Sequence, residues 1–408
     1  MQYPQLKIYQ INVVANSGST GRITEGIITK AMKLNYTCYL AYGRWANHSK
    51  ADLFKIGSKF DIYYHAAVSM LLDKHGLASK NATKKLIKDL TEKKPDIIHL
   101  HNIHGYYLNY PILFNFLSKL NIPIIWTLHD CWSYTGHCVY YTAVNCEKWK
   151  KGGCNKCLNL KEYPLSLGKD SSQSNFILKR EVFTSIKDMT IITVSDWLKK
   201  EVEQSFLSKY KIKTIHNGVD INKFYPISIE KKHTKWHDKF IILGVATVWS
   251  TRKGLDDFIK LSQHLSNDEI IILIGLSKKQ IKQLPFNIIG IEKTENVKDL
   301  VNYYSIADLY INFSIEETFG MTTIESMACG TPALVVNSTA SPEIVNDDVG
   351  FVIEPHDIDA AKNIIALVKK NTKKYYSEKC RSYVVKKYNE EDRFNEYIEL
   401  YQKVLLKK

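Results

Sequence analysis

The chain has 408 residues, more than one hydrophobic core usually organises, so the length predicts two domains. Hydrophobic residues make up 45% of it and charged residues 24%, the balance of a globular protein rather than a disordered one. The longest apolar runs are about half the length that spans a bilayer, which argues against a membrane-spanning helix. The first residues lack the charged and then apolar layout of a secretory signal, so we expect a cytoplasmic protein.

The formal net charge is +14, and all of the excess lies in the first half of the chain. Residues 1–226 carry 31 Lys and Arg against 17 Asp and Glu, whereas the remaining residues are balanced. A solvated basic surface, an anionic membrane, a polyphosphate ligand or a nucleic acid would each account for this excess. Lysines alternate with apolar residues over 79–94, which predicts an amphipathic helix with Ser79 as its N-cap.

The first half alternates short β-branched runs with helical segments, the pattern of a parallel sheet covered by helices. A glycine-containing turn at 16–22 and a helix at 23–34 follow the first run. Each run ends in a polar residue, so polar side chains are expected at the carboxyl edge of the sheet. The five predicted strands cover residues 7–15, 38–43, 95–102, 122–130 and 189–196.

A connector with Asn-Gly and a closing Pro covers residues 210–226, and the alternation then restarts. We therefore predict an α/β protein of two doubly wound, Rossmann-like domains that face each other across a cleft. The second set of predicted strands covers residues 240–248, 269–275, 308–314 and 332–337, and the helices cover 254–265, 296–307, 323–330 and 390–408.

The stretch EETFGMTTIE, from Glu316 to Glu325, follows one of these strands. Gly320 permits a tight turn, and a helix that begins near Met321 presents unpaired N–H groups to a phosphate. Glu317 would lie in the loop. Glu325 would lie about one turn into the helix, where a carboxylate accepts two hydrogen bonds from a vicinal diol such as a ribose. On spacing alone, the alternative of one capping acid and one solvated helix acid is as well supported as ligand binding by the pair.

The longer stretch EETFGMTTIESMACGTPALV resembles the signature of the large retaining glycosyltransferase family with the GT-B fold, often called family 4. Further segments resemble that family in the same order along nearly the whole chain: NSGSTGR, DIIHLHN, TLHD, TVSDWL, IHNGVDINKFYP, TRKGLDDFI and SPEIVNDDVGF. The resemblance implies an acceptor-binding domain at 1–215 and a nucleotide-sugar-binding domain at 216–390. It also implies a last helix at 391–408 that packs back on the first domain, and sugar transfer with retention of the anomeric configuration.

By this resemblance, Glu325 binds the donor ribose, Glu317 contacts the transferred sugar and Lys253 binds the diphosphate. Many family members carry an arginine upstream of that lysine, where this chain has Thr247, and Arg252 is its candidate substitute. An exposed basic turn is the alternative for Arg252 and Lys253. The expected donor site further includes the loop glycine and the residues around the helix start: Gly21, Phe319, Gly320, Met321 and Thr322.

His129 ends a predicted strand, and in the resembling family a histidine there approaches the transferred sugar. We therefore assign it a catalytic role beside Glu317 and Lys253. His99 and His101 lie on one face of the preceding predicted strand, so packing and hydrogen bonding are favoured over metal binding for them.

Five of the eight cysteines lie between residues 131 and 157. In a cytoplasmic chain, such clustering indicates a metal rather than disulfides, and four sulfurs suit a tetrahedral structural zinc. Reduced, partly buried thiols are the alternative. The zinc would brace an insertion at 131–160, whose aromatic side chains either stack on sugar rings or pack. The expected ligands are Cys138, Cys146, Cys154 and Cys157, and the aromatic residues are Trp132, Tyr134, Tyr140, Tyr141 and Trp149.

No Asp-x-Asp motif follows a predicted strand, so the donor is expected to bind without a catalytic divalent cation. Retention with no evident enzymic nucleophile then favours front-face attack. A donor phosphate oxygen would take the proton of the acceptor hydroxyl, and Lys253, Arg252 and the helix N-terminus would stabilise the departing diphosphate.

We expect a UDP or GDP sugar as donor, and as acceptor a growing glycan on a polyprenyl diphosphate in bacterial surface-polysaccharide biosynthesis. The basic first half fits peripheral docking at the inner face of the cell membrane. The alternatives are a soluble GT-B enzyme that makes a small glucoside or a sugar phosphate, and a degenerate, non-catalytic transferase. Nucleic acid is not expected as a partner, because the chain lacks a helix-turn-helix or an RNA-binding sheet signature.

Overall fold

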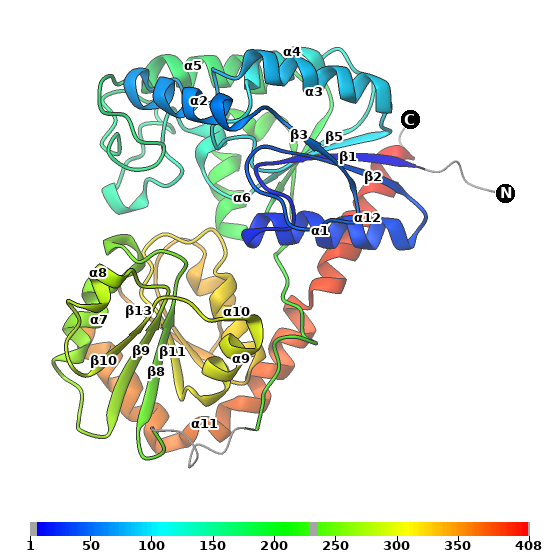
Figure 1. Cartoon of the computed structure of the whole chain (residues 1–408). Coiled ribbons are helices and arrows are strands. Elements are labelled where there is room, and N and C mark those ends of the chain that lie inside the picture. The colour runs from blue at the N-terminus through cyan, green and yellow to red at the C-terminus, as the bar shows by residue number, and fades with distance from the viewer. Residues whose placement is uncertain (1–5, 229–235, 407–408) are drawn as a thin grey trace. The chain divides into compact units, whose positions relative to one another are not determined.

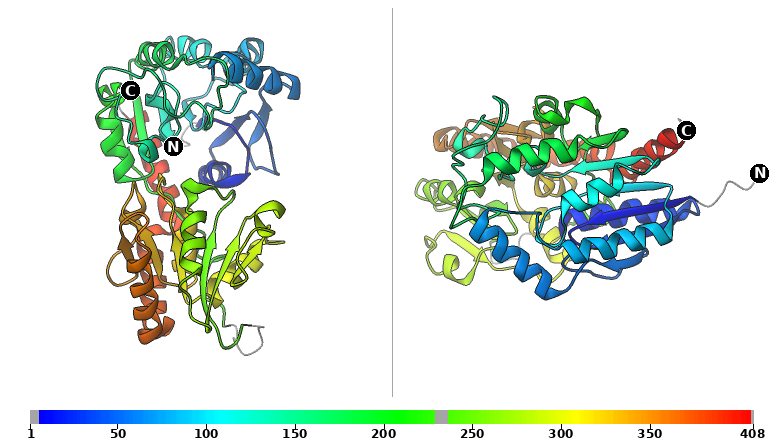
Figure 2. Two further views of the ribbon diagram at one scale, coloured as in Figure 1. Left: turned by 90° about the vertical axis from the view of Figure 1, so that its left-hand side faces the viewer. Right: turned by 90° about the horizontal axis from the view of Figure 1, so that it is seen from above.

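The computed structural model describes residues 6–228 and 236–406, which divide into two compact units (Figure 1). The first unit comprises residues up to His216 together with those from Arg393 onward, and the second comprises Asn217–Asp392. Each unit is built on one parallel sheet with helices on both faces (Figure 2). The predicted α/β class with two doubly wound domains is therefore confirmed, whereas the cleft between them stays a prediction.

The first unit contains a seven-stranded sheet in which neighbouring strands run parallel. The strand order is β3-β2-β1-β4-β5-β6-β7. From β1 the sheet extends to one side through β2 and β3, and from β4 onward it extends to the other side, as in a Rossmann fold. The inner strands β4, β5 and β6 are buried along their whole length, as their apolar sequences require. The strands are β1 (Lys7–Asn12), β2 (Thr37–Tyr42), β3 (Asp52–Lys55), β4 (Ile97–Leu100), β5 (Ile124–Leu128), β6 (Met189–Thr193) and β7 (Lys211–Thr214).

One sequence prediction on the helices of this unit is wrong, and the prediction of Ser79 as the N-cap of α3 holds for its position but not for its side chain. Helix α1 begins at Gly18, so Gly21 lies in its first turn rather than in a glycine loop. Ser79 precedes α3, but its φ is 55° and its hydroxyl pairs with His65 Nδ1 at 2.8 Å, so its side chain does not cap the helix. The helices are α1 (Gly18–Lys33), α2 (Lys59–Leu72), α3 (Lys80–Lys93), α4 (Tyr110–Leu117), α5 (Ser172–Phe183) and α6 (Asp196–Glu203).

The second unit repeats the architecture with six parallel strands in the order β10-β9-β8-β11-β12-β13. The sheet extends to one side from β8 through β9 and β10, and to the other side from β11 onward, so the strand order changes direction between β8 and β11. The strands are β8 (Phe240–Val245), β9 (Glu269–Ile274), β10 (Ile288–Ile291), β11 (Leu309–Asn312), β12 (Ala333–Val336) and β13 (Gly350–Ile353). The helices are α7 (Leu255–Ser262), α8 (Lys278–Ile281), α9 (Val297–Ile306), α10 (Met321–Ala328) and α11 (Ile358–Tyr388).

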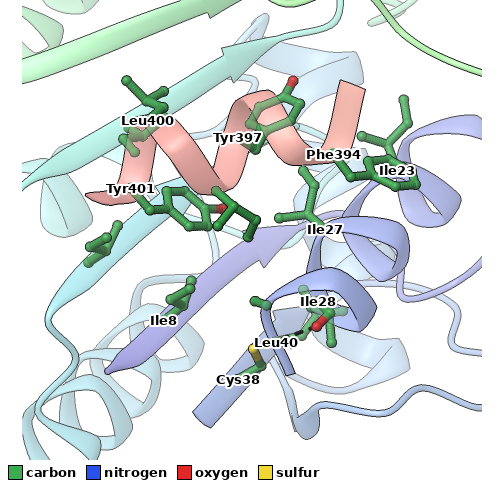
Figure 3. Close-up of a cluster of buried hydrophobic side chains, with 14 of the residues drawn as sticks. Ile8, Ile23, Ile27, Ile28, Cys38, Leu40, Phe394, Tyr397, Leu400 and Tyr401 are labelled. Carbon is green, nitrogen blue, oxygen red and sulfur yellow. Dashed lines mark hydrogen bonds between the residues drawn. The ribbon is translucent and has the colours of Figure 1, made fainter. Parts of the chain in front are cut away.

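The last helix, α12 (Glu390–Leu405), contributes its apolar face to the core of the first unit (Figure 3). Phe394 and Tyr401 pack there against Ile27 of α1 and Ile8 of β1. Gly26 has no side chain, and a Cβ at that position would overlap the Phe394 ring. Residues 407–408, the end of the predicted helix, lie outside the described residues. Within the described residues, no helix combines the length and the apolar character needed to cross a bilayer.

The strands that the sequence reading missed are the four outermost ones, β3, β7, β10 and β13. An outer strand is shielded by neighbours on one side only, so it does not need a continuous apolar sequence. The residues of β3 are mostly exposed and those of β7 and β10 mostly half-buried, which explains their weak pattern.

Candidate functional site

In the second unit, the predicted donor residues gather where the strand order changes direction. β8 and β11 are neighbours, with Leu309 aligned to Ile242, and the loops beyond their carboxyl ends carry the residues of interest. In open α/β sheets, this position is where ligands bind. The loop after β8 leads to Lys253, and the loop after β11 carries Glu317.

Lys253 and Glu317 form an ion pair in which Lys253 Nζ donates to Glu317 Oε1. The Glu317 backbone is fixed on both sides, because its N–H donates to Thr339 Oγ1 at 2.9 Å and its C=O accepts from the Ala340 N–H at 3.2 Å. The two side chains are 22% and 14% exposed, so the pair is shielded from solvent yet remains partly accessible.

Glu316, which the sequence reading did not single out, is buried beside Arg252. Arg252 donates from a guanidinium nitrogen to Glu316 O at 3.1 Å, and its Nε lies 3.9 Å from Glu316 Oε2. The Ile315 N–H in turn donates to Arg252 O at 3.1 Å. Arg252 thus ties the loop after β8 to the loop after β11. Two adjacent glutamates in a sequence offer no sign of which one is buried.

The helix that follows this loop begins as predicted, at Met321. Gly320 has φ +104°, a backbone conformation that favours glycine, and a Cβ there would lie 2.8 Å from Ile344 Cδ1, so the end of that buried side chain would have to shift. The N–H groups of Met321 and Thr322 precede the first intrahelical hydrogen bond and carry the positive end of the helix dipole. Thr322 Oγ1 is held by the Tyr310 hydroxyl at 2.7 Å.

Glu325 lies one turn into α10 and is buried, with its Oε2 accepting from the Tyr304 hydroxyl at 3.0 Å. Burial, followed by the charge of Glu325, holds the pKa of Tyr304 well above its ordinary value, so Tyr304 stays a neutral donor. Phe319 is also buried, and its ring packs edge-on against Tyr388 at 5.7 Å. The Phe319 side chain therefore supports the loop rather than lining an open surface.

In the first unit, His129 follows β5 and belongs to a buried chain of hydrogen bonds. Gln10 Nε2 donates to Thr24 O at 3.4 Å, and Gln10 Oε1 lies 2.7 Å from His101 Nε2. His101 Nδ1 lies 3.2 Å from His129 Nε2. The Thr24 carbonyl only accepts, which orients the Gln10 amide. It follows that His101 carries its proton on Nε2 and His129 on Nε2, with the His129 lone pair on Nδ1. Burial lowers the pKa of His129 to about 4, so the ring is neutral near pH 7.

The other histidines of this edge are engaged within the protein. His99 is fully buried between the Tyr401 hydroxyl, at 2.6 Å, and Thr127 Oγ1, at 2.8 Å. His104 Nε2 lies 2.7 Å from Asp130 Oδ2. These contacts agree with the packing role expected for His99 and His101.

Gly21 lies in the first turn of α1, close to the end of β1. A Cβ there would approach Val14 Cγ2 at 3.1 Å and the Asn16 backbone nitrogen at 3.2 Å, so a side chain at this position would require the β1 loop to shift by a few tenths of an ångström. Thr24 Oγ1 donates to Gly21 O at 2.8 Å, which joins this turn to the hydrogen-bond chain that ends at His129.

The four predicted zinc ligands of the insertion are only partly gathered. Cys138 Sγ lies 3.6 Å from Cys157 Sγ, close to the roughly 3.7 Å that two thiolates on one tetrahedral zinc would show. In the absence of a metal, the two thiols form a hydrogen bond, which lowers the pKa of Cys157. Cys154 Sγ accepts from the Gly136 N–H at 3.1 Å. Among the residues that the structure describes, no three of these sulfurs lie within 4.8 Å of one another, so two of the four fit a common metal and the zinc stays a prediction.

Most aromatic side chains of the insertion pack in the interior, which decides between the two sequence interpretations for them. Trp132, Tyr134, Tyr141 and Trp149 are buried, and only Tyr140 is half-exposed. The tyrosine and tryptophan rings at 134, 141 and 149 contact one another with centroids 4.8–6.3 Å apart.

Comparisons with known proteins identify the family of both halves of the chain. Residues 32–223 match the model of "Glycosyltransferase Family 4" and residues 227–387 that of "Glycosyl transferases group 1". The chain is 24% identical over 342 residues to an uncharacterized 41.2 kDa protein in the cps region of Klebsiella pneumoniae, covering 78% of this chain and 81% of that protein. It is 20% identical over 378 residues to the putative colanic acid biosynthesis glycosyl transferase WcaC of Escherichia coli K12, covering 86% and 88%.

A solved structure supports the fold. Anabaena Alr3699/HepE, crystallised in complex with UDP and glucose, aligns over 97% of this chain and 99% of that one with a TM-score of 0.67 and 15% identity. At this identity, the likeness establishes a shared fold.

Proposed function

The chain belongs to the GT-B glycosyltransferases of the family 4 type, and from this premise we propose that it transfers a sugar, with retention of configuration, from a nucleotide-diphosphate sugar to a growing glycan. The observation that carries the proposal is that four groups of suitable chemistry meet at the carboxyl ends of β8 and β11, where the strand order changes direction. A cation, a loop carboxylate, a helix N-terminus and a buried helix carboxylate meet there within one compact unit.

In this proposal, the second unit binds a UDP or GDP sugar. The N–H groups of Met321 and Thr322 hold the diphosphate together with Lys253. Glu325, oriented by Tyr304, accepts from the ribose hydroxyls, and Glu317 accepts from hydroxyls of the transferred sugar. Arg252 contributes its positive potential and positions the loop through Glu316.

Catalysis would follow from stabilising the leaving group, without a bound divalent metal. As the glycosidic bond breaks, negative charge grows on the diphosphate. Lys253 and the α10 dipole would stabilise that charge, because both are already oriented before the reaction. The acceptor hydroxyl attacks on the same face and passes its proton to a donor phosphate oxygen. His129, a neutral imidazole near pH 7, is the proposed catalytic histidine of the first unit.

We propose a lipid-linked glycan acceptor in bacterial surface-polysaccharide biosynthesis, bound by the first unit at the inner face of the cell membrane. The similarity to WcaC and to the cps-region protein supports the pathway class. The excess of 14 positive charges in residues 1–226 supports docking on anionic lipid and on a diphosphate.

The experiment is a thermal-shift panel of UDP, GDP, ADP, dTDP and CMP sugars on the wild type, Glu325→Ala and the control Glu292→Ala. Glu292 is an exposed glutamate of the same unit. A donor at about 100 times its Kd stabilises by about 2.7 kcal/mol, which we expect for one nucleotide class with the wild type and the control but not with Glu325→Ala. If no nucleotide sugar shifts the wild type, the donor site does not function as proposed and a degenerate transferase is favoured. NMR of the product's anomeric proton tests retention.

We also propose that the cysteines of the insertion bind a structural zinc. Metal analysis of the purified protein, with Cys138→Ser and Cys157→Ser beside the buried control Cys380→Ser, tests this. About one zinc per chain, lost in the first two variants only, is the expected result. A metal-free wild type would favour reduced thiols.

A further inference from the structure

A cavity of about 650 Å³ opens between the insertion that follows β5 and helix α6, which follows β6. Insertion residues between 141 and 155 line it together with two residues of α6, so the cavity belongs to the first unit alone. Its volume falls in the range of small-molecule sites, about 300–1,000 Å³. The residues assigned above to catalysis and to the donor lie elsewhere in the chain.

The cavity lies at the same edge of the first sheet as His129. β5 and β6 are parallel neighbours, with Leu128 aligned to Thr193. His129 directly follows β5, and α6 begins at Asp196, shortly after the end of β6. Because neighbouring strands are about 4.8 Å apart, a ligand beside His129 can extend from the end of β5 toward the start of α6.

Helix α6 contributes an aromatic ring and a carboxylate to the lining. Trp197 and Glu201 are four residues apart, so they lie one above the other on one helix face. Trp197 is half-buried, and the Glu201 side chain is 12% exposed. An indole ring packs against the apolar C–H face of a sugar, and a carboxylate accepts hydrogen bonds from two neighbouring hydroxyls. The two side chains together therefore have the chemistry of a sugar site.

Three donors of the protein hold the Glu201 carboxylate in one orientation. The Tyr141 hydroxyl donates to Oε2, whereas Lys150 Nζ and Gln204 Nε2 donate to Oε1 at 3.2 and 3.4 Å. Burial holds the pKa of Tyr141 above its ordinary value, so its hydroxyl stays a donor. A carboxylate offers about four acceptor positions, so this oriented group can still accept from a ligand.

The polar groups that the lining leaves to a ligand are mainly uncharged. Asn145 and Asn155 are exposed, and within the described residues neither side-chain amide has a hydrogen-bond partner. The lysines of the lining are engaged instead. Lys148 Nζ donates to two backbone carbonyl oxygens at 3.0 and 2.9 Å, and Lys150 and Lys151 pair with carboxylates. A neutral ligand rich in hydroxyls therefore matches the lining better than a phosphate or an acidic sugar.

We propose that the cavity is a subsite for a neutral sugar residue of the acceptor glycan, which stacks on Trp197 and donates hydrogen bonds to Glu201. The proposal rests on the proposed function, since it names where the glycan binds beyond its reacting sugar. A glycan whose reacting end lies beside His129 extends past the neighbouring end of β6, where the cavity opens. The enzyme therefore prefers acceptors that already carry more than one sugar, because a single sugar would leave the cavity unfilled.

The test is binding of the full chain, without donor, to an array of neutral and acidic oligosaccharides of bacterial polysaccharides, followed by the Kd of the best neutral one. Trp197→Ala should raise that Kd at least about tenfold, since the stacking surface is lost. Trp197→Phe keeps an aromatic ring and should retain most of the affinity. The control Phe286→Ala changes an aromatic side chain that is 101% exposed in the second unit, and it should bind like the wild type.

Hydrogen exchange locates the bound oligosaccharide, which should slow the amides of residues 141–155 and 197–204. Slowing only in other segments would overturn the proposal. So would an array without neutral hits, preferential binding of acidic oligosaccharides, or equal Kd values for Trp197→Ala and the wild type. If Trp197→Ala lowers the melting temperature, the wild-type exchange pattern and Trp197→Phe still decide.

The donor-induced thermal shift, measured on the same samples, separates the two hypotheses. A normal shift without oligosaccharide binding refutes only the glycan subsite. Oligosaccharide binding without a shift refutes only the donor site.

Discussion

Replacing Lys253 with methionine removes the ammonium group and keeps much of the side-chain volume, so it separates charge from packing. Lys253 is the one predicted donor residue whose amine contacts a predicted sugar-binding carboxylate, Glu317. If this amine stabilises the departing diphosphate, turnover should fall by about 10²–10³-fold, or roughly 2.7–4 kcal/mol, the cost of losing one donor to a developing anion.

The same substitution has a structural cost that can be separated from the catalytic one. Glu317 is 14% exposed, which places the pair between exposed ion pairs, worth about 0–1 kcal/mol, and buried pairs, whose disruption costs about 3–5 kcal/mol. We expect a loss of about 1–3 kcal/mol in the second unit. Lys253→Met/Glu317→Gln leaves no unpaired carboxylate, so it should recover stability without recovering turnover.

The assay is release of nucleoside diphosphate at saturating donor, with melting temperature measured on the same samples and Lys253→Arg as the charge-preserving control. Turnover of Lys253→Met close to that of the wild type would refute the leaving-group role. Recovery of turnover in the double variant would show instead that Lys253 serves only to neutralise Glu317.

Gly320→Ala should destabilise the second unit by about 1–2 kcal/mol of backbone strain and about 1–3 kcal/mol of overlap with Ile344, and weaken donor binding. Gly152→Ala, at a similar φ of +101° with nothing within 4 Å, should show the strain alone, and equal losses in denaturant titrations would contradict this account. Phe394→Ala should lower the stability of the first unit by about 3–5 kcal/mol in the same titrations, and a small loss would mean that α12 is not a core element. Burial lowers the pKa of His65 to about 4, so the unfolded chain binds the proton first and the melting temperature should fall as pH drops from about 6.5 toward 4. Buried His99 and His129 titrate in the same direction, so His65→Gln should reduce that dependence by one proton's share, and an unchanged slope would exclude His65 as a source.

The inner strands could be read from the sequence because burial on both faces demands continuous apolar residues. The runs at 97–100 and 124–128 are buried throughout and were predicted within a few residues. β3 and β7 were not predicted from the sequence, because outer strands tolerate the polar and half-exposed residues that these segments carry. The start of α1 was also misplaced, because Gly18 and Gly21 favour a turn locally, whereas close packing against the β1 loop makes glycine suitable for a helix start there.

The sequence by itself determined the two α/β domains, the helix start at Met321 and the identities of the candidate donor residues, because strand burial and helix termini are local consequences of residue pattern. Only the tertiary structure decided the partners of those residues. It buries Glu316 beside Arg252 and pairs Glu317 with Lys253, and it sets the proton of His129 through Gln10 and His101. These partners lie far apart along the chain, and the direction of each side chain is set by the elements packed around it, which no short stretch of sequence records.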